Sequence, residues 1–164
     1  MIPNVKFFLK GDGGPLIKTS RDIFDNKRIV LFSLPGAFTP ICSTKMLPAY
    51  ENLYLEFKKF GIDEVYCIAV NDCFVMDAWA EDLFISHVKM LPDGNGDFTK
   101  GMGMLVAKTN LGYGNRSWRY ATVINSGEIE WLSEEPGHRS NTDQDPYEQS
   151  KPTKVLDYLK KVAK

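Results

Sequence analysis

The segment TPIC, residues 39–42, places a cysteine where its thiol is chemically activated. An apolar run over residues 29–33 precedes it, and a long amphipathic run follows it. Helix-capping rules make Thr39 the N-cap, Pro40 the first helical residue and Cys42 the third. Unpaired backbone N–H groups and the helix dipole favour negative charge there, and a thiolate is the reactive form of cysteine. The sequence therefore predicts that Cys42 is a nucleophile, whereas a cysteine without such neighbours is usually an inert core residue.

The other two cysteines and the two histidines show weaker signs of a catalytic or metal-binding role than Cys42 does. Cys67 lies inside the apolar run EVYCIAV, which is typical of a buried central strand and favours an inert thiol. Cys73 follows the end of that run, beside Asp72, and is expected to be more exposed. His87 and His138 have no CxxC or HxxxH partner, so we expect no zinc site. A Cys–His protease dyad is not excluded by residue counting, although no recognisable motif surrounds either histidine.

The segment DGNGD, residues 93–97, begins like a calcium-binding EF-hand loop. Phe98 and Met104 stand where such a loop needs glycine and glutamate, respectively. We therefore expect a turn at this segment and no bound metal.

The composition is that of an ordinary globular protein. The 164 residues are 43% apolar and 25% charged, a length and composition that predict a single domain over residues 1–164. Twenty basic residues against 21 acidic ones create no field that would attract nucleic acid. The sequence shows no secretion signal and no apolar run long enough for a bilayer, so we expect no membrane partner and a cytoplasmic location. Three cysteines without an export signal indicate free thiols rather than a disulfide framework.

Hydrophobic periodicity predicts an α/β fold of the thioredoxin-like kind, with a central mixed sheet flanked by helices. The early strands are expected to be parallel and the last pair antiparallel. The segment 133–150 is expected to be a long surface loop. Strands are predicted at 29–33, 64–70, 88–91, 119–124 and 128–132. Helices are predicted at 43–60, kinked at Pro48 and ended by Gly61, at 73–85, capped by Asn71 or Asp72, and at 153–162.

The segment LPGAFTPICS resembles the active-site signature of the peroxiredoxins, in which a proline, a threonine and a cysteine stand at fixed spacing. Pro35, Thr39 and Cys42 fill these positions. The resemblance covers residues 22–132 through the blocks FDNKRIVLFSLPGAFTP, VNDCFVMDAW, LPDGNGDFTKGMGML and GYGNRSWRYATVI. These blocks are similar to the type II branch, and especially to the peroxiredoxin half of bacterial peroxiredoxin–glutaredoxin hybrids.

The resemblance implies a role for each residue of the site. Cys42 would attack a peroxide oxygen, Thr39 would orient the thiolate and the substrate, and Pro35 would shield the site from water. Arg119, in WRYATVI, would stabilise the thiolate and the oxyanion that develops as the O–O bond breaks. Arg116 lies nearby in the sequence and is expected to be a solvated loop residue.

The resemblance also implies a reaction and its partners. The expected activity is reduction of hydrogen peroxide and small alkyl hydroperoxides without metal, haem or flavin, so no cofactor is expected. Cys67 stands where the type II branch often has a second cysteine and is the candidate resolving residue. Some relatives carry a resolving cysteine in the segment 133–150, but none occurs here, so glutathione or glutaredoxin is the expected reductant. A homodimer is expected, with Phe38 and Trp79 as candidate contact residues beside the active-site loop.

Two other functions use the same thiol. A thiol–disulfide reductase is disfavoured because the chain has no CxxC motif and no second thiol beside Cys42 in the sequence. A redox sensor or holdase would be oxidised at Cys42 once and would then wait for its partner. A turnover assay with peroxide and a thiol reductant separates this alternative from an enzyme.

Overall fold

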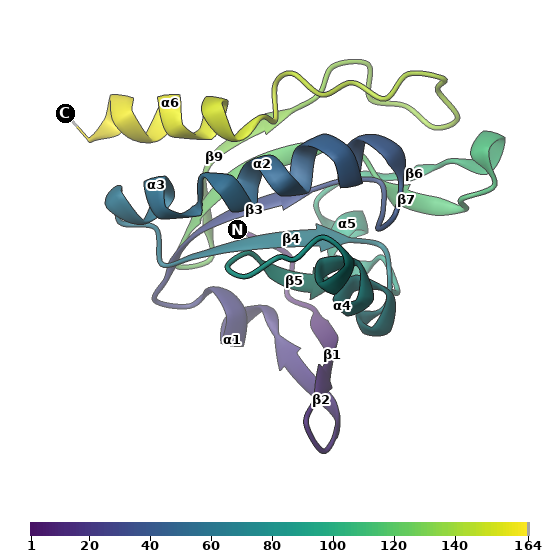
Figure 1. Cartoon of the computed structure of the whole chain (residues 1–164), viewed down its shortest axis with the longest axis horizontal. Helices are drawn as coiled ribbons and strands as arrows, with labels where there is room; N and C mark the ends of the chain where they lie inside the picture. Colours follow the sequence, from purple (N-terminus) through teal and green to yellow (C-terminus); the bar gives the residue numbers. More distant parts are fainter. Residues whose placement is uncertain (164) are drawn as a thin grey trace.

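The centre of the structure is a five-stranded mixed sheet with the order β5-β4-β3-β8-β9 (Figure 1). The structure is a computed structural model and describes residues 1–163. In it, β4 runs parallel to β3 and β5, whereas β8 is antiparallel to β3 and β9. The predicted central mixed sheet is confirmed, including its parallel early strands and its antiparallel last pair. The strands are β3 (Arg28–Ser33), β4 (Glu64–Ala69), β5 (Lys89–Pro92), β8 (Tyr120–Asn125) and β9 (Glu128–Glu134).

Helices cover both faces of this sheet. Figure 1 shows α2, α3 and α6 together on one side of the sheet and α1 on the other. The α-helices are α1 (Ser20–Phe24), α2 (Leu47–Asn52), α3 (Tyr54–Lys59), α4 (Cys73–Asp82), α5 (Asp97–Gly101) and α6 (Pro152–Val162). A π-helical turn, η1 (Cys42–Met46), precedes α2, and a 3₁₀ turn, η2 (Thr109–Leu111), lies further along the chain.

The two faces form two hydrophobic cores because successive strand residues point in opposite directions. Val30 and Phe32 of β3 belong to the larger core, which includes residues of α2, α3, α4 and α6. Ile29 and Leu31 belong to the second core, which includes residues of α1 and α5. All four side chains are completely buried, and this explains why β3 reads as an uninterrupted apolar run.

The predicted helix over residues 43–60 is divided in the structure. In η1 the Leu47 N–H donates to the carbonyl of Cys42, which is a π-helical bond. Pro48 follows in the first turn of α2. Because proline has no N–H, Pro48 cannot donate an α-helical hydrogen bond to a carbonyl of η1. The break between α2 and α3 falls at Leu53 instead of at the proline. The irregularity associated with Pro48 is therefore a widened turn that begins at the cysteine.

The start of α4 confirms one predicted cap and corrects the role of Trp79. Asp72 is the N-cap, and its carboxylate accepts a 2.9 Å bond from the Val75 N–H. The other cap candidate, Asn71, instead accepts a 2.9 Å bond from the Ala37 N–H in the active-site loop, residues 34–39 between β3 and the helix that begins at Pro40. Trp79 is completely buried, so its predicted place on a dimer surface is wrong.

The structure contains two short hairpins that the sequence analysis did not predict. β1 (Lys6–Gly11) pairs with β2 (Gly14–Thr19), and Figure 1 shows this hairpin projecting from the body of the molecule. β6 (Leu105–Ala107) pairs with β7 (Asn115–Ser117). Each strand of the second hairpin has only three residues, which is too short for a periodic pattern to predict a strand.

The segment DGNGD forms a turn, as predicted. The buried Asp93 carboxylate accepts bonds from the backbone of Phe98 and Thr99, at 3.2 and 2.8 Å, and from the Thr99 hydroxyl. Asp93 therefore stabilises the first turn of α5. No helix within residues 1–163 is long and apolar enough to cross a membrane.

Candidate active site

The site begins where β3 ends and the chain turns into a helix at Pro40. The Ser43 N–H donates to the Thr39 carbonyl at 3.0 Å, which places Cys42 in the first helical turn, as predicted. Thr39 stands at the predicted N-cap position, but among the described residues no helix N–H donates to its side chain, whose hydroxyl donates to the Gly36 carbonyl at 2.7 Å. Cys42 is completely buried. The π turn that begins at this residue is a feature that helical periodicity does not reveal.

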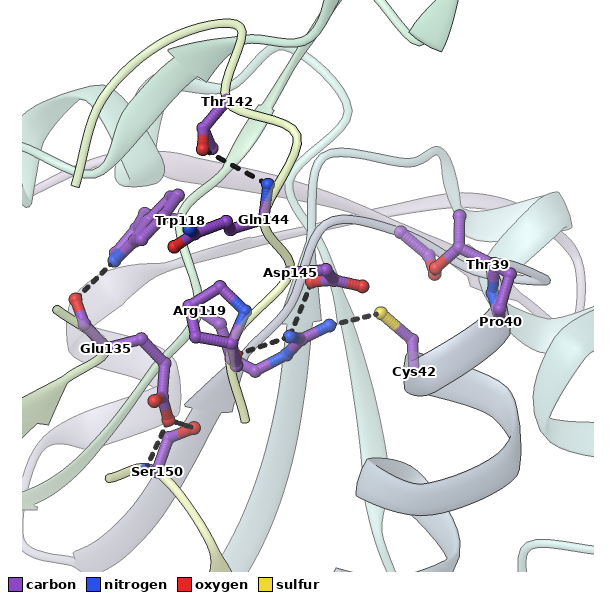
Figure 2. A network of polar contacts seen from close by, with 12 residues as sticks. Thr39, Pro40, Cys42, Trp118, Arg119, Glu135, Thr142, Gln144, Asp145 and Ser150 are labelled. Atoms are coloured by element: carbon purple, nitrogen blue, oxygen red, sulfur yellow. Dashed lines mark hydrogen bonds and ion pairs between the residues drawn. The ribbon is translucent and has the colours of Figure 1, made fainter. Parts of the chain in front are cut away.

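Arg119 lies directly against the thiol. Its Nη2 is 3.3 Å from the Cys42 Sγ, and only 2% of its surface is exposed (Figure 2). The sheet brings the two residues together, because Ser33 at the end of β3 pairs with Tyr120 at the start of β8. Burial alone would lower the pKa of Arg119, but the charges of Cys42 and Asp145 outweigh it and raise that pKa. The guanidinium is therefore a permanent positive charge beside the sulfur.

Asp145 is a site residue that the sequence prediction missed. Its Oδ1 accepts a 2.6 Å bond from Arg119 Nη1, and the same nitrogen donates to the Pro146 carbonyl at 2.7 Å. Figure 2 shows the guanidinium between Asp145 and Cys42. Arg119 Nε is buried and has no hydrogen-bond partner among residues 1–163. No local signal identified Asp145, because it lies in the predicted surface loop and its contact is entirely tertiary.

The loop that carries Asp145 is fixed by a buried carboxylate. Glu135 is completely buried and accepts bonds from the Ser150 N–H and hydroxyl, at 2.7 and 2.5 Å, and from the Glu148 and Gln149 N–H groups. Burial by itself would raise the pKa of Glu135, but these hydrogen bonds outweigh it and lower that pKa. The segment 133–150 contains no helix, as expected for a loop. It is more ordered than a solvated loop, because hydrogen bonds to Glu135 near its start hold residues 148–150 at its end (Figure 2).

The structure corrects the interpretation of Arg116. Its side chain is half-buried, and its Nη1 donates to the Pro35 carbonyl at 3.3 Å while its Nε donates to the Tyr113 carbonyl at 3.1 Å. Arg116 is therefore a contact between β7 and the active-site loop rather than a solvated residue. Pro35 itself is buried.

A cavity of about 220 Å³ opens beside the loop that carries Cys42. One wall is formed by the active-site loop, and the opposite walls come from the turn between β6 and β7 and from the loop that carries Asp145. Its lining comprises Pro35, Thr39, Pro40, Lys108, Leu111, Tyr113 and residues 142–145.

The other cysteines lie apart from this arrangement. Cys67 is completely buried in β4, where it pairs with Phe32 on one side and Met90 on the other. Burial, assisted by the charge of Cys42, raises the pKa of Cys67 well above its ordinary value. Cys73 is partly exposed at the start of α4 and lines a separate cavity of about 440 Å³ next to the β1–β2 hairpin.

The histidines have partners outside the thiol site. His87 Nδ1 lies 3.0 Å from the Glu51 carboxylate, and His138 Nδ1 lies 3.1 Å from that of Glu134. Within residues 1–163, no three metal-ligating side chains of the His, Cys, Asp or Glu type come together.

Comparisons with known proteins agree with this geometry. The family model described as Redoxin matches residues 1–149. A peroxiredoxin of Rhizobium etli is 59% identical over 143 residues, which cover 87% of this chain and 80% of that protein. The hybrid peroxiredoxin hyPrx5 of Haemophilus influenzae is 45% identical over 158 residues, covering 96% of this chain and 64% of the longer relative.

Solved structures of peroxiredoxins also superpose closely on this chain. The Plasmodium falciparum antioxidant protein, described as a 1-Cys peroxiredoxin, superposes with a TM-score of 0.93 at 36% identity, covering 98% of both chains. Reduced Prx3 of Vibrio vulnificus in complex with hydrogen peroxide superposes with a TM-score of 0.88 at 34% identity, covering 96% of this chain and 95% of the other. The fold is thus thioredoxin-like. The chain belongs to the peroxiredoxins, within the redoxin family, and is a peroxidase.

Proposed function

We propose that this chain reduces hydrogen peroxide and small alkyl hydroperoxides at Cys42, and that glutathione or glutaredoxin returns the cysteine to its reduced form. The observation that carries this proposal is the 3.3 Å contact between Arg119 Nη2 and Cys42 Sγ. Both residues are buried, and the cysteine lies in the first turn of a helix. A fixed cation and the helix N-terminus both favour the thiolate, which is the nucleophilic form.

The proposed oxidation uses few protein groups. The Cys42 thiolate attacks one peroxide oxygen, the O–O bond breaks, and the other oxygen takes a proton and leaves as water or an alcohol. Cys42 becomes a sulfenic acid. Arg119 stabilises the thiolate and the negative charge that develops on the leaving oxygen. Its Nε, which has no partner among residues 1–163, is available to donate to a peroxide oxygen.

Thr39 and Pro35 complete the proposed site. The Thr39 hydroxyl uses its proton on the Gly36 carbonyl, so its oxygen remains available to accept a hydrogen bond from the peroxide. This arrangement would orient the substrate towards the sulfur. Pro35 is buried beside the loop and would keep water from the thiolate.

The burial of Cys67 supports reduction by an external thiol. A disulfide between Cys67 and Cys42 requires their sulfurs to reach bonding distance, and Cys67 is completely buried in a central strand. Its raised pKa keeps it in the less nucleophilic thiol form. The segment 133–150 contains no cysteine. An internal resolving reaction would therefore need local unfolding of the central strand β4, in addition to any opening that exposes Cys42.

We also propose that residues 1–164 form a single cytoplasmic domain that assembles as a homodimer. Phe38, in the active-site loop, is 55% exposed, and Phe74 at the start of α4 is 67% exposed. Exposed aromatic side chains are enriched at protein interfaces. The proposed dimer contact therefore includes Phe38 and excludes the buried Trp79.

The test of this function is steady-state peroxide turnover with two donor systems. Cys42→Ser should abolish turnover, whereas the Cys67→Ser/Cys73→Ser double variant should retain most of it with glutathione and glutaredoxin. Many turnovers per chain would exclude a sensor that is oxidised only once. Activity remaining in Cys42→Ser would refute the nucleophile. A wild type that turned over only with thioredoxin, or a double variant that lost activity with glutaredoxin, would refute the proposed reductant.

A further inference from the structure

Lys108 is a buried cation that the proposed mechanism does not use. It follows β6, lines the 220 Å³ cavity, and is only 4% exposed. Its backbone is held by a 2.7 Å bond from its N–H to the Gly114 carbonyl. Its Nζ lies 5.7 Å from the centre of the Trp118 ring, so the side chain is supported by an aromatic face. None of the ion pairs within residues 1–163 includes Lys108.

The Lys108 side chain is largely buried, but its ammonium keeps some exposure beside the cavity and forms no hydrogen bond within residues 1–163. Partial desolvation without an ionic partner is energetically unfavourable. Burial lowers the pKa of Lys108, although the negative charges of Asp145 and Cys42 oppose this effect. Asp145 is the carboxylate in the cavity lining that acts most on Lys108, but its Oδ1 is already hydrogen-bonded to Arg119 Nη1 at 2.6 Å. An anionic group that entered the cavity would give Lys108 the partner that the protein does not supply.

The charge balance around the cavity changes when Cys42 is oxidised. When Cys42 is a thiolate, three negative groups lie near Lys108 and Arg119: the sulfur and Asp145, which both contact Arg119, and Asp143, which lines the cavity together with Lys108. A sulfenic acid is neutral at this stage, so one of the three negative charges disappears. The two cations are then opposed by two carboxylates. The oxidised site therefore attracts an anion more strongly than the reduced site does.

We propose that Lys108 binds a carboxylate of the thiol that reduces the oxidised Cys42, so that the cavity selects anionic thiols. This rests on the proposed function, in which an external thiol performs that reduction. The incoming sulfur attacks the Cys42 sulfur, the S–O bond breaks, and hydroxide leaves with a proton as water. The product is a mixed disulfide, and a second thiol then releases reduced Cys42 and a low-molecular-weight disulfide.

The test measures only the reduction step. Cys42 is converted to its sulfenic acid with one equivalent of hydrogen peroxide and mixed with 3-mercaptopropionate or with 2-mercaptoethanol, which lacks the carboxylate. For each protein, the ratio of the two rate constants is recorded. Comparing this ratio between variants cancels the different intrinsic reactivities of the two thiols.

Lys108→Met should lower the ratio of anionic to neutral thiol about tenfold, the effect of losing one charge-assisted hydrogen bond. Lys108→Arg keeps the positive charge and should retain most of the preference. Lys100→Met is the matched control, because Lys100 is exposed on α5 and does not line the cavity. Its ratio should equal that of the wild type. High salt should reduce the preference of the wild type but not that of Lys108→Met.

The outcomes separate this inference from the proposed reductant. An unchanged ratio in Lys108→Met would overturn the inference, as would equal slowing with both thiols, which would mean that Lys108 acts on Cys42 itself. A preference for 3-mercaptopropionate that depends on Lys108, combined with no turnover on glutathione, would support the carboxylate site while refuting glutathione as the donor.

Discussion

At the scale of single residues, the site depends on the hydrogen bonds that the Arg119 guanidinium donates to several partners. Arg119 donates through Nη2 to the Cys42 sulfur and through Nη1 to Asp145 and the Pro146 carbonyl. These bonds fix the plane of the group, so that its charge faces the sulfur without reorganisation during the reaction. A lysine has one nitrogen at the end of a flexible stem and cannot reproduce this two-sided contact.

We expect Arg119→Ala to slow the reaction of Cys42 with hydrogen peroxide about 100- to 1,000-fold, the effect of removing one oxyanion donor. Arg119→Lys should lie between this variant and the wild type, because it restores charge without the geometry. The second-order rate constant from stopped-flow mixing with peroxide measures the effect. Circular dichroism should show that both variants are folded. Wild-type rates in Arg119→Ala would mean that the arginine beside the sulfur has no part in catalysis.

At the scale of secondary-structure elements, three segments that are distant in sequence converge on the thiol. The end of β3 leads into the loop and helix that carry Cys42, and the start of β8 supplies Arg119. The segment 133–150 then passes over Arg119 and supplies Asp145. Glu135 holds this last segment by accepting hydrogen bonds from its far end at residues 148–150.

Glu135→Gln should destabilise the protein at neutral pH by about 1–3 kcal/mol, because the new amide group would face hydrogen-bond donors. The folded pKa of Glu135 is lowered, so its stabilising contribution is complete above its unfolded pKa of about 4.3 and is lost as the pH falls through the lower folded value. The difference in unfolding free energy between wild type and variant should therefore shrink on acidification.

Urea unfolding of both proteins between pH 7 and pH 3 measures this difference. Glu81→Gln is the control, since Glu81 is exposed on α4, and it should change stability little at any of these pH values. A difference between wild type and Glu135→Gln that stayed constant down to pH 3 would contradict the assignment of a lowered pKa to Glu135.

At the scale of the whole molecule, two hydrophobic cores pack against the sheet, and the candidate site lies where the inner strands β3 and β8 meet the loops. The larger core includes Cys42, Cys67 and Trp79, so the proposed nucleophile and the second buried thiol are parts of the same packed interior. Next to this interior, the active-site loop exposes Phe38, whose backbone has a φ of 62°. This left-handed conformation is unusual for a residue other than glycine. The residue that adopts it also exposes its aromatic ring beside the site.

We expect the wild type to sediment as a dimer and Phe38→Glu to shift it towards monomer, because a charge would be buried in an apolar contact. Leu55→Glu is the matched control. Leu55 is 65% exposed on α3, away from the active-site loop, and its replacement should leave the dimer intact. Sedimentation velocity at several protein concentrations measures the effect. Unchanged association of Phe38→Glu would place the contact elsewhere or show that the protein is a monomer.

Features that depend on local chemistry and on hydrophobic periodicity follow from the sequence alone. The order Pro35, Thr39 and Cys42 and the helix start at Pro40 are local properties, so the position of Cys42 in the first helical turn was predictable. The five central strands were predictable because apolar runs bounded by polar turns must be buried. The cap at Asp72 and the turn at residues 93–97 also follow from neighbouring residues.

Which distant groups meet the thiol depends on how the complete chain folds. Asp145 and Cys42 share Arg119 although they are far apart in the sequence, and a polar residue in a loop shows no pattern that reveals its partner. The burial of Trp79 and the position of Lys108 in the cavity likewise follow from how elements pack. Local sequence specifies backbone preferences, whereas burial and charge pairing depend on contacts between residues that only the complete fold brings together.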